Sequence, residues 1–106
     1  MKFIIRSTAR QDILNQFIYL IDQGVPNVAS RFVDAVDETI SRLTKQPNIG
    51  MPKKLKNPRL QGIRKWPVKG FEVVWIYYLV TKDALRVIRV LHGKRDINRI
   101  LDSERD

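Results

Sequence analysis

The chain has 106 residues, 43% of them hydrophobic, which is enough for one domain with its own core but not for two. The absence of cysteine excludes disulfides, thiolate metal sites and a thiol nucleophile, and a single histidine cannot build a His/Cys metal centre. The apolar stretch near the N-terminus is too short for a signal-peptide core, and no stretch approaches membrane-spanning length. We therefore expect one cytoplasmic domain, residues 1–106, without cofactor or metal and without membrane contact.

The formal charge of +9 is concentrated in the second half of the chain. Residues 1–50 carry six Lys/Arg against five Asp/Glu, whereas residues 51–106 carry fourteen against six. One segment holds seven cations and no acid: Lys53, Lys54, Lys56, Arg59, Arg64, Lys65 and Lys69. Because no acid balances these cations, the segment favours a polyanionic partner, either nucleic acid or an acidic protein, over a loop that only aids solubility.

The chain opens with a short β-rich segment, residues 2–6, which predicts a first strand. Residues 9–22 follow with apolar side chains at helical spacing, and Ser7 or Thr8 is expected to cap that helix. Gly24 suits the position just past the helix end, because glycine adopts positive φ without steric cost.

A second helix is expected after Pro26, with Asn27 as its cap. It must stop before Pro47, because the residue before a proline disfavours helical geometry. Two helices joined by so few residues form an antiparallel αα-hairpin. The apolar stripe of the second helix consists of Ala29, Phe32, Val33, Val36, Ile40 and Leu43.

The second half of the chain predicts three strands. Residues 47–58 contain three prolines and a glycine and read as a loop. Residues 62–68 are a plausible strand, which Pro67 restricts to an edge or a strand end. Residues 71–81 are apolar on both alternating faces, as in a central strand buried on both sides. Residues 85–92 form the last strand of an antiparallel meander.

Asp96 is expected to cap a short final helix that runs to Leu101, and the charged tail, residues 102–106, is expected to be frayed. The order strand, helix, helix, three strands predicts an α+β fold. In it, the αα-hairpin packs on a mostly antiparallel sheet, since neither layer can hide its own apolar face.

Two arginines interrupt the last strand. Arg86 and Arg89 are three residues apart, so strand alternation predicts that they lie on opposite faces. One is expected to pair with an acid of the second helix such as Asp37 or Glu38, which leaves the other free for a ligand.

The chemistry that this inventory permits is metal-free RNA cleavage, with a base, an acid and cations that stabilise the phosphorane. Protons could be exchanged by His92, Tyr77 or Tyr78, and phosphate could be bound by Lys54, Arg64, Arg86 or Arg89. A single histidine at a strand end is more often a hydrogen-bonded structural residue, and we favour that interpretation for His92.

Four segments carry a family resemblance: "STARQDILNQFIYL", "ISRLTKQPNIG", "GIRKWPVKGFEVVWIYYLV" and "IRVLHGKRDINRIL". The last is the most specific, because a strand ending Arg-Val-Leu-His-Gly is followed by a basic residue, Arg and Asp. The chain resembles the RelE/ParE superfamily of toxins from type II toxin–antitoxin systems, closest to the ParE-like plasmid-stabilisation branch.

The resemblance implies a cytoplasmic toxin that a cognate antitoxin neutralises. The ParE-like branch is associated with inhibition of DNA gyrase, and the RelE-like branch contains ribosome-dependent mRNA endonucleases. For a nuclease, the resemblance implies Arg64, Arg89 and His92 as catalytic residues. No glutamate occurs in the loop at residues 46–48 and no tyrosine follows His92, and these departures favour a gyrase inhibitor that acts by binding.

We therefore predict a toxin that binds DNA gyrase, with the ribosome and mRNA as alternative targets and a non-toxic interaction module as a further alternative. The antitoxin is expected to place an acidic segment on a sheet edge or beside the hairpin. The predicted partner-binding residues are Lys53, Lys54, Lys56, Arg64, Lys65, Lys94 and Arg95.

Overall fold

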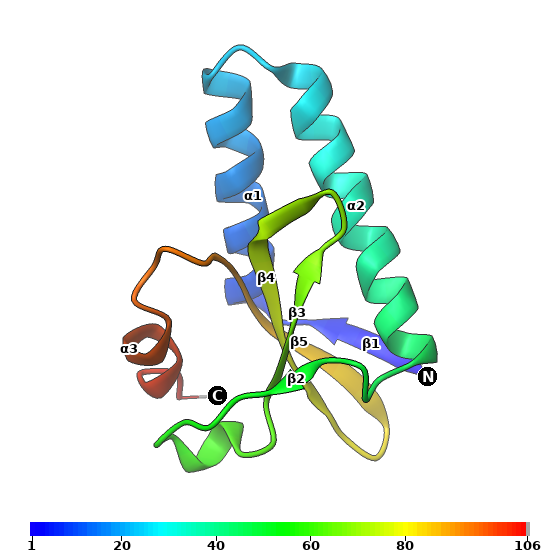
Figure 1. Ribbon diagram of the computed structural model, residues 1–106, viewed down its shortest axis with the longest axis vertical. Helices are drawn as coiled ribbons and strands as arrows, with labels where there is room; N and C mark the ends of the chain where they lie inside the picture. Colours follow the sequence, from blue (N-terminus) through cyan, green and yellow to red (C-terminus); the bar gives the residue numbers. More distant parts are fainter. Residues whose placement is uncertain (106) are drawn as a thin grey trace.

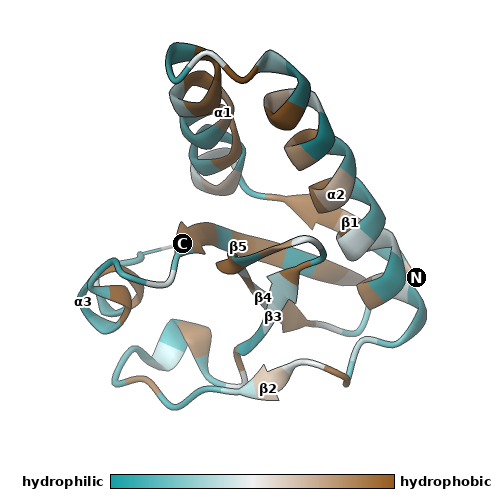
Figure 2. Ribbon diagram, turned by 45° about the horizontal axis from the view of Figure 1, so that its top comes forward, coloured by the Kyte–Doolittle hydropathy of each residue, from teal (hydrophilic) through white to brown (hydrophobic). Residues whose placement is uncertain are grey.

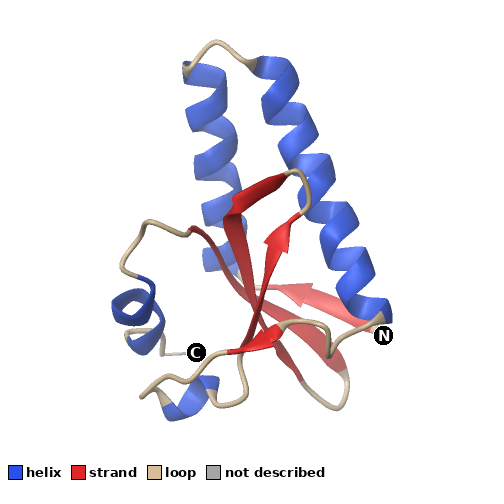
Figure 3. Ribbon diagram, in the orientation of Figure 1, coloured by secondary structure: helices blue, strands red, loops and turns tan. Residues whose placement is uncertain are grey.

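Figure 1 shows the computed structural model of the chain, which describes residues 1–105. An αα-hairpin covers one face of a five-stranded sheet, and a short helix near the C-terminus lies apart from the hairpin (Figures 1 and 3). The elements are β1 (Lys2–Ile5), α1 (Ser7–Asp22), α2 (Pro26–Lys45), β2 (Met51–Pro52), the 3₁₀ helix η1 (Pro58–Leu60), β3 (Arg64–Val68), β4 (Phe71–Val80), β5 (Ala84–His92) and α3 (Ile97–Asp102). The predicted α+β class and hairpin-on-sheet arrangement are confirmed.

The strand order of the sheet is β1-β5-β4-β3-β2. Strands β3, β4 and β5 form the predicted antiparallel meander, and β4 is central as expected. Strand β1 returns beside β5 in parallel, from Lys2 opposite Ala84 to Ile5 opposite Val87. Strand β2, which the sequence did not predict, pairs with only the first two residues of β3. Pro67 therefore faces no strand on that side, which its missing N–H requires.

In both helices the residue at the N-cap position precedes the predicted caps. Helix α1 starts at Ser7, and Arg6 occupies its N-cap position without a side-chain hydrogen bond. The prediction that Ser7 or Thr8 caps this helix is wrong, because β1 turns directly into α1 while the Arg6 N–H still bonds the Val87 carbonyl of β5 (3.1 Å).

Helix α2 starts at Pro26, so the prediction that Asn27 caps it is also wrong. Proline favours the first helical position, where no N–H is needed and its fixed φ already suits a helix. Between the two helices Gly24 has a φ of +77°, which confirms its predicted role after the end of α1.

The sheet separates two apolar clusters. On the hairpin side the buried residues are Ala9, Phe32, Val36, Ile40, Leu43, Val68, Val74, Ile76, Tyr78, Leu85, Val87 and Val90. On the other side they are Leu60, Ile63, Tyr77, Ile88, Leu91 and Leu101. The adjacent Tyr77 and Tyr78 fall in different clusters, so the middle of β4 is buried on both faces as predicted. Its beginning is not, since Val73 is 59% exposed.

Tyr78 fastens the loop after α2 to the sheet. Its buried hydroxyl donates to the Pro47 carbonyl (2.8 Å) and accepts the Gly50 N–H (2.9 Å). A Cβ atom built on Gly50 would overlap the Tyr78 hydroxyl and ring. Glycine is therefore required at this position by close approach, without any need for positive φ.

We predict that Gly50→Ala lowers the free energy of unfolding by about 1 to 3 kcal/mol, as overpacking of a filled site does. Asn48→Ala, in the same loop but exposed, is the matched control and should change the stability by no more than about 0.5 kcal/mol. Urea unfolding of both variants measures the difference, and equal stabilities would contradict the close approach.

Candidate functional site

Arg89 on β5 is the centre of an ion-pair network. Its guanidinium donates to both carboxylate oxygens of Asp12 on α1, with Nε–Oδ2 at 2.7 Å and Nη2–Oδ1 at 2.8 Å. Its Nη1 donates to Glu104 Oε1 at 2.8 Å. The side chains of Arg89, Asp12 and Glu104 are only 17%, 8% and 10% exposed. The hydrogen bond to Asp12 raises the pKa of Arg89 above its ordinary value, burial opposes this, and Glu104 adds to the rise.

The same Asp12 carboxylate also accepts the backbone N–H of Val90 (3.0 Å). Strand β1 pairs with β5 only as far as Val87, so the rest of β5 has no strand partner on that side. Thr8 of α1 donates to the Ile88 carbonyl (3.5 Å). Side chains at the start of α1 thus continue the hydrogen bonding of β1 along β5.

The predicted arrangement of the two arginines is wrong. Leu79 of β4 stands opposite Arg86, and Tyr77 stands opposite Arg89. Between these pairs the register shifts, because the neighbours Tyr77 and Tyr78 stand opposite residues 89 and 87, which are two positions apart on β5. The extra residue is Ile88, a β-bulge that shifts the alternation by one. Opposed side chains lie on the same face of a sheet, and Leu79 and Tyr77 belong to the cluster away from the hairpin. The side chains of Arg86 and Arg89 therefore both leave β5 on that face.

Neither predicted acid pairs with these arginines. Arg89 binds Asp12 and Glu104 rather than Asp37 or Glu38, and Glu38 contacts Lys69 instead (3.5 Å). The bulge and the course of α1 bring Arg89 to the end of the hairpin where α1 begins. Arg86 is exposed.

The C-terminal segment is docked where the sequence predicted a frayed tail. Glu104 binds Arg89 and Arg6, with Arg6 Nη2 to Glu104 Oε2 at 3.6 Å. Asp102 Oδ1 accepts the N–H groups of Lys56 and Asn57 (3.0 and 3.1 Å). The Asn57 amide donates to the carbonyls at positions 101 and 104. The prediction of fraying is therefore wrong up to residue 104, because two mostly buried arginines and the Asn57 amide hold this segment. Asp106 lies outside the described residues.

The predicted cap of α3 is present. Asp96 occupies the N-cap position and its side chain accepts the Arg99 N–H at 3.4 Å. This fixes the direction in which α3 leaves β5 and brings Leu101 into the second apolar cluster.

The three residues that a nuclease would use are not brought together. Arg64 stands opposite Tyr78, on the hairpin face, and Arg89 stands opposite Tyr77, on the other face. The Arg64 Nη1 donates to the carbonyl of Gly50 (2.7 Å) and to that of Asn48 (3.3 Å).

His92 takes part in the turn that follows β5. Its Nδ1 accepts the Lys94 N–H (3.1 Å), and it lies opposite Val74. Arg64 lies opposite Tyr78, which is four positions from Val74 on β4. At the usual rise per strand residue, His92 and Arg64 are therefore about 13 Å apart along the strand direction. Each of these side chains serves the local structure instead of converging on a common point.

The two tyrosines considered for proton exchange are poorly suited to it. Burial raises the pKa of Tyr77 to about 12. Burial also raises the pKa of Tyr78, although its hydrogen bond from Gly50 and the charge of Arg64 act in the opposite direction. Both phenols stay protonated near neutral pH.

Residues 53–62, which we call the basic loop, carry three of the predicted partner-binding residues. Lys53, Lys54 and Lys56 line one groove of about 460 Å³. The loop is ordered by its backbone, because the Lys53 N–H donates to the Ile63 carbonyl (2.9 Å) and Asp102 holds the N–H of Lys56.

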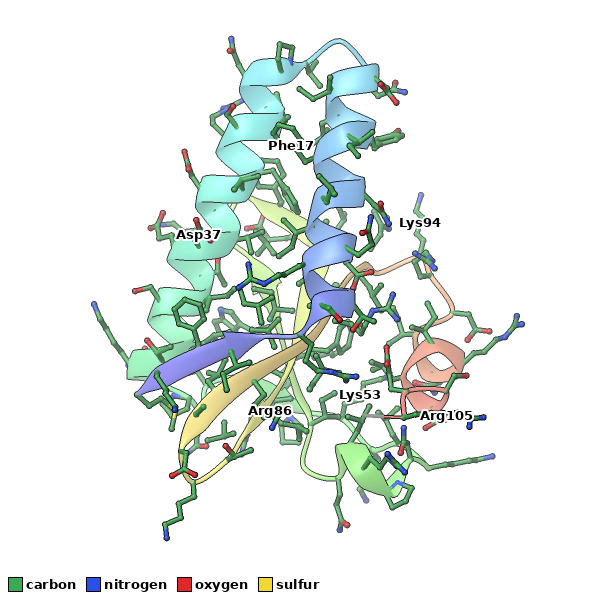
Figure 4. The ribbon with its side chains drawn as sticks, turned by 180° about the vertical axis from the view of Figure 1, so that it is seen from behind. Phe17, Asp37, Lys53, Arg86, Lys94 and Arg105 are labelled. Atoms are coloured by element: carbon green, nitrogen blue, oxygen red, sulfur yellow. The ribbon has the colours of Figure 1, made fainter. Side chains whose placement is uncertain are left out.

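The other predicted partner-binding residues lie elsewhere. Lys65 is placed over the Trp75 ring, with Nζ 4.7 Å from the centroid, on the sheet face opposite Arg64. Lys94 and Arg95 are exposed in the turn after β5. Figure 4 shows Lys53 and Lys94 in separate parts of the molecule.

Sequence reasoning missed an exposed apolar stripe on α1. Only Ala9 of this helix is buried, whereas Leu14, Ile18 and Ile21 are 48%, 46% and 41% exposed. The hairpin extends beyond the sheet, so the distal part of α1 has no strand beneath it (Figures 1 and 2). The signal was present in the sequence, since residues 13–21 hold more apolar side chains than one packed face can use.

Two further properties bear on function. Within residues 1–105, no three His, Cys, Asp or Glu side chains are grouped so that they could hold a metal ion. Of the helices described, none has the length and apolar character needed to cross a membrane.

Comparison with known proteins gives a family and a fold. A family model described as "ParE toxin of type II toxin-antitoxin system, parDE" matches residues 3–97. The structure is similar to one described as "Chromosomal ParDE TA system from P. aeruginosa", with a TM-score of 0.71 and 16% sequence identity over 87% of this chain and 95% of that one. No curated protein matches the chain.

We predict that Arg89→Met lowers the free energy of unfolding by about 3 kcal/mol, because it leaves the nearly buried Asp12 carboxylate without its cation and Glu104 with the longer contact to Arg6. Arg86→Met on the same strand is the matched control, and being exposed it should cost no more than about 0.5 kcal/mol. Urea denaturation followed by circular dichroism measures both. If the two variants are equally stable, the network does not hold the fold.

Proposed function

Since the chain belongs to the ParE toxin family of type II toxin–antitoxin systems, we propose that it is a toxin that inhibits DNA gyrase by binding. The family implies an antitoxin partner, and we propose that a small acidic antitoxin, encoded beside the toxin, neutralises it. The proposed setting is the cytoplasm and the proposed role is plasmid stabilisation.

Support for binding over catalysis comes mainly from the dispersal of the candidate nuclease residues. Arg64 and Arg89 start from opposite faces of the sheet and their guanidinium groups already bond oxygens of the chain itself. General acid–base catalysis needs its groups within hydrogen-bond reach of one substrate. The ribosome-dependent mRNA endonuclease is therefore the less supported alternative. The other alternative, a non-toxic interaction module, would differ from the toxin only in its effect on cells.

The exposed stripe of α1 supports a protein partner. Leu14, Ile18 and Ile21 follow one another at helical spacing along α1 and are 41% to 48% exposed. Exposed apolar side chains in such a row fit the apolar face of an amphipathic helix. We propose that the antitoxin covers this stripe, and that its acidic residues are attracted by the net positive charge of the toxin.

We predict that the purified chain inhibits DNA supercoiling by gyrase and stabilises the cleaved gyrase–DNA complex. His92→Ala should inhibit equally, because the proposed mode does not use this histidine. Gel assays of plasmid topology measure both effects. Folded protein that neither inhibits supercoiling nor traps cleaved DNA would disprove the gyrase proposal.

Primer extension in a translating extract tests the endonuclease alternative in parallel. Codon-linked cuts that disappear in His92→Ala would favour the nuclease over the gyrase inhibitor. Induced expression without growth arrest would favour the non-toxic interaction module.

For the antitoxin we predict that Leu14→Ser combined with Ile18→Ser weakens binding by about tenfold or more, as the loss of central apolar contacts does. Val73→Ser removes a comparably exposed apolar side chain from β4 and is the matched control. Surface plasmon resonance with the acidic protein encoded beside the toxin gives both affinities. It should also show an association rate that falls with added salt, and a rate independent of salt would contradict the electrostatic part.

A further inference from the structure

The basic loop presents cations that no acid neutralises. Lys53, Lys54, Lys56 and Arg59 form no ion pair with any acid in the described part of the chain. Lys54, Lys56 and Arg59 are exposed, and Lys53 is half-buried at the rim of the same groove. The loop therefore carries a local excess of positive charge.

Three acids near the C-terminal end of the chain are used for internal contacts. Asp102 is held by the backbone N–H groups at positions 56 and 57, and Glu104 is held by Arg89 and Arg6. Asp96 caps α3. These carboxylates stabilise the C-terminal segment and its contact with the loop. Their acceptor atoms are directed at backbone N–H groups and at the mostly buried Arg6 and Arg89 rather than at the side chains of the loop lysines.

The loop backbone is also preorganised. The hydrogen bonds at Lys53 and Lys56 fix both ends of the lysine segment, and Asn57 caps η1 through the Arg59 N–H (3.0 Å). A ligand that binds here has to order only the lysine side chains, which lowers the entropic cost of binding.

This surface has the composition of a polyanion site rather than of a protein interface. Protein interfaces rely on large apolar or aromatic anchors at their centre. Of the residues that the structure describes, 52–72, which include the basic loop, contain no exposed large hydrophobic side chain, and neither do 81–105. The exposed apolar stripe of α1 is on the hairpin, whereas the loop lies at the other end of the molecule (Figures 1 and 2).

We propose that the basic loop binds the phosphodiester backbone of nucleic acid through Lys53, Lys54 and Lys56. This goes beyond the proposed function, because it requires neither gyrase nor an antitoxin. Lysine contacts to phosphate carry no base information, so the binding is independent of sequence and strongly dependent on salt.

The test is fluorescence anisotropy of the full chain with three probes: a short DNA duplex, an RNA duplex of the same sequence and polyglutamate of equal charge. The loop variant changes Lys53, Lys54 and Lys56 to Gln, which removes the three charges but keeps the backbone hydrogen bonds and a polar side chain only one atom shorter. The control variant changes Arg10, Arg31 and Lys45 to Gln, three exposed cations of the hairpin. A third variant changes the three loop lysines to Arg and keeps their charge.

Each lysine–phosphate contact contributes about −0.9 to the slope of log affinity against log salt, so the loop variant should lose about 2 to 3 from the magnitude of that slope. Its affinity should fall by about tenfold or more at moderate salt, while the control and arginine variants stay close to the wild type. Binding of either duplex in this pattern supports the proposal, and the DNA and RNA probes show which nucleic acid is preferred.

Three outcomes would overturn it. The wild type could fail to bind either duplex at low salt, the control variant could lose as much affinity as the loop variant, or polyglutamate could bind as tightly as the duplexes. Urea unfolding of the loop variant is the folding control. A loop variant that no longer binds duplexes but still inhibits gyrase would leave the gyrase proposal intact. Failure of the nucleic-acid proposal is therefore distinguishable from failure of the gyrase proposal.

Discussion

The fold depends on the ion pairs of Arg89, which join three parts of the chain that are distant in sequence. Asp12 on α1 lies 77 positions before this arginine and Glu104 lies 15 positions after it. A guanidinium this little exposed is stable only when its charge is matched, and two carboxylates supply the match. Through it, the start of the hairpin is held on β5 and the C-terminal segment is held over the second apolar cluster. A cation on an inner strand is thus a structural requirement of this fold.

Periodicity in the sequence predicted the helices, the meander and the central place of β4, because each depends on local spacing and on residues that end an element. It failed where a single residue changed the geometry. Ile88 is the clearest case, since a bulge at this position puts Arg86 and Arg89 on one face and no pattern in the sequence marks it. The parallel pairing of β1 with β5 was equally beyond local rules, because it joins the two ends of the chain.

For the candidate sites too, the sequence predicted some features and the structure was needed for others. The cation-rich segment was evident from composition, and the structure adds that it is a groove on an ordered loop. The frayed tail was predicted from its charge, yet Asp102 and Glu104 are the groups that dock it. The stripe on α1 escaped notice because exposed and packed apolar residues look alike in a helical pattern. The outcome is a molecule with an apolar surface on its hairpin and a cationic one on its loop, two surfaces suited to different classes of partner.

The parallel pairing of β1 with β5 also constrains when this protein can exist in its folded form. The outermost contacts of the sheet join positions 2–5 to positions 84–87, so β1 has no partner strand while the chain is still being synthesised up to that point. The carboxylate of Glu104 arrives later still. Contacts between such distant positions slow folding, and a growing chain adds only about 5 to 20 residues per second. The sheet can therefore close only after residues 84–87 have been synthesised, which at this rate is several seconds after β1.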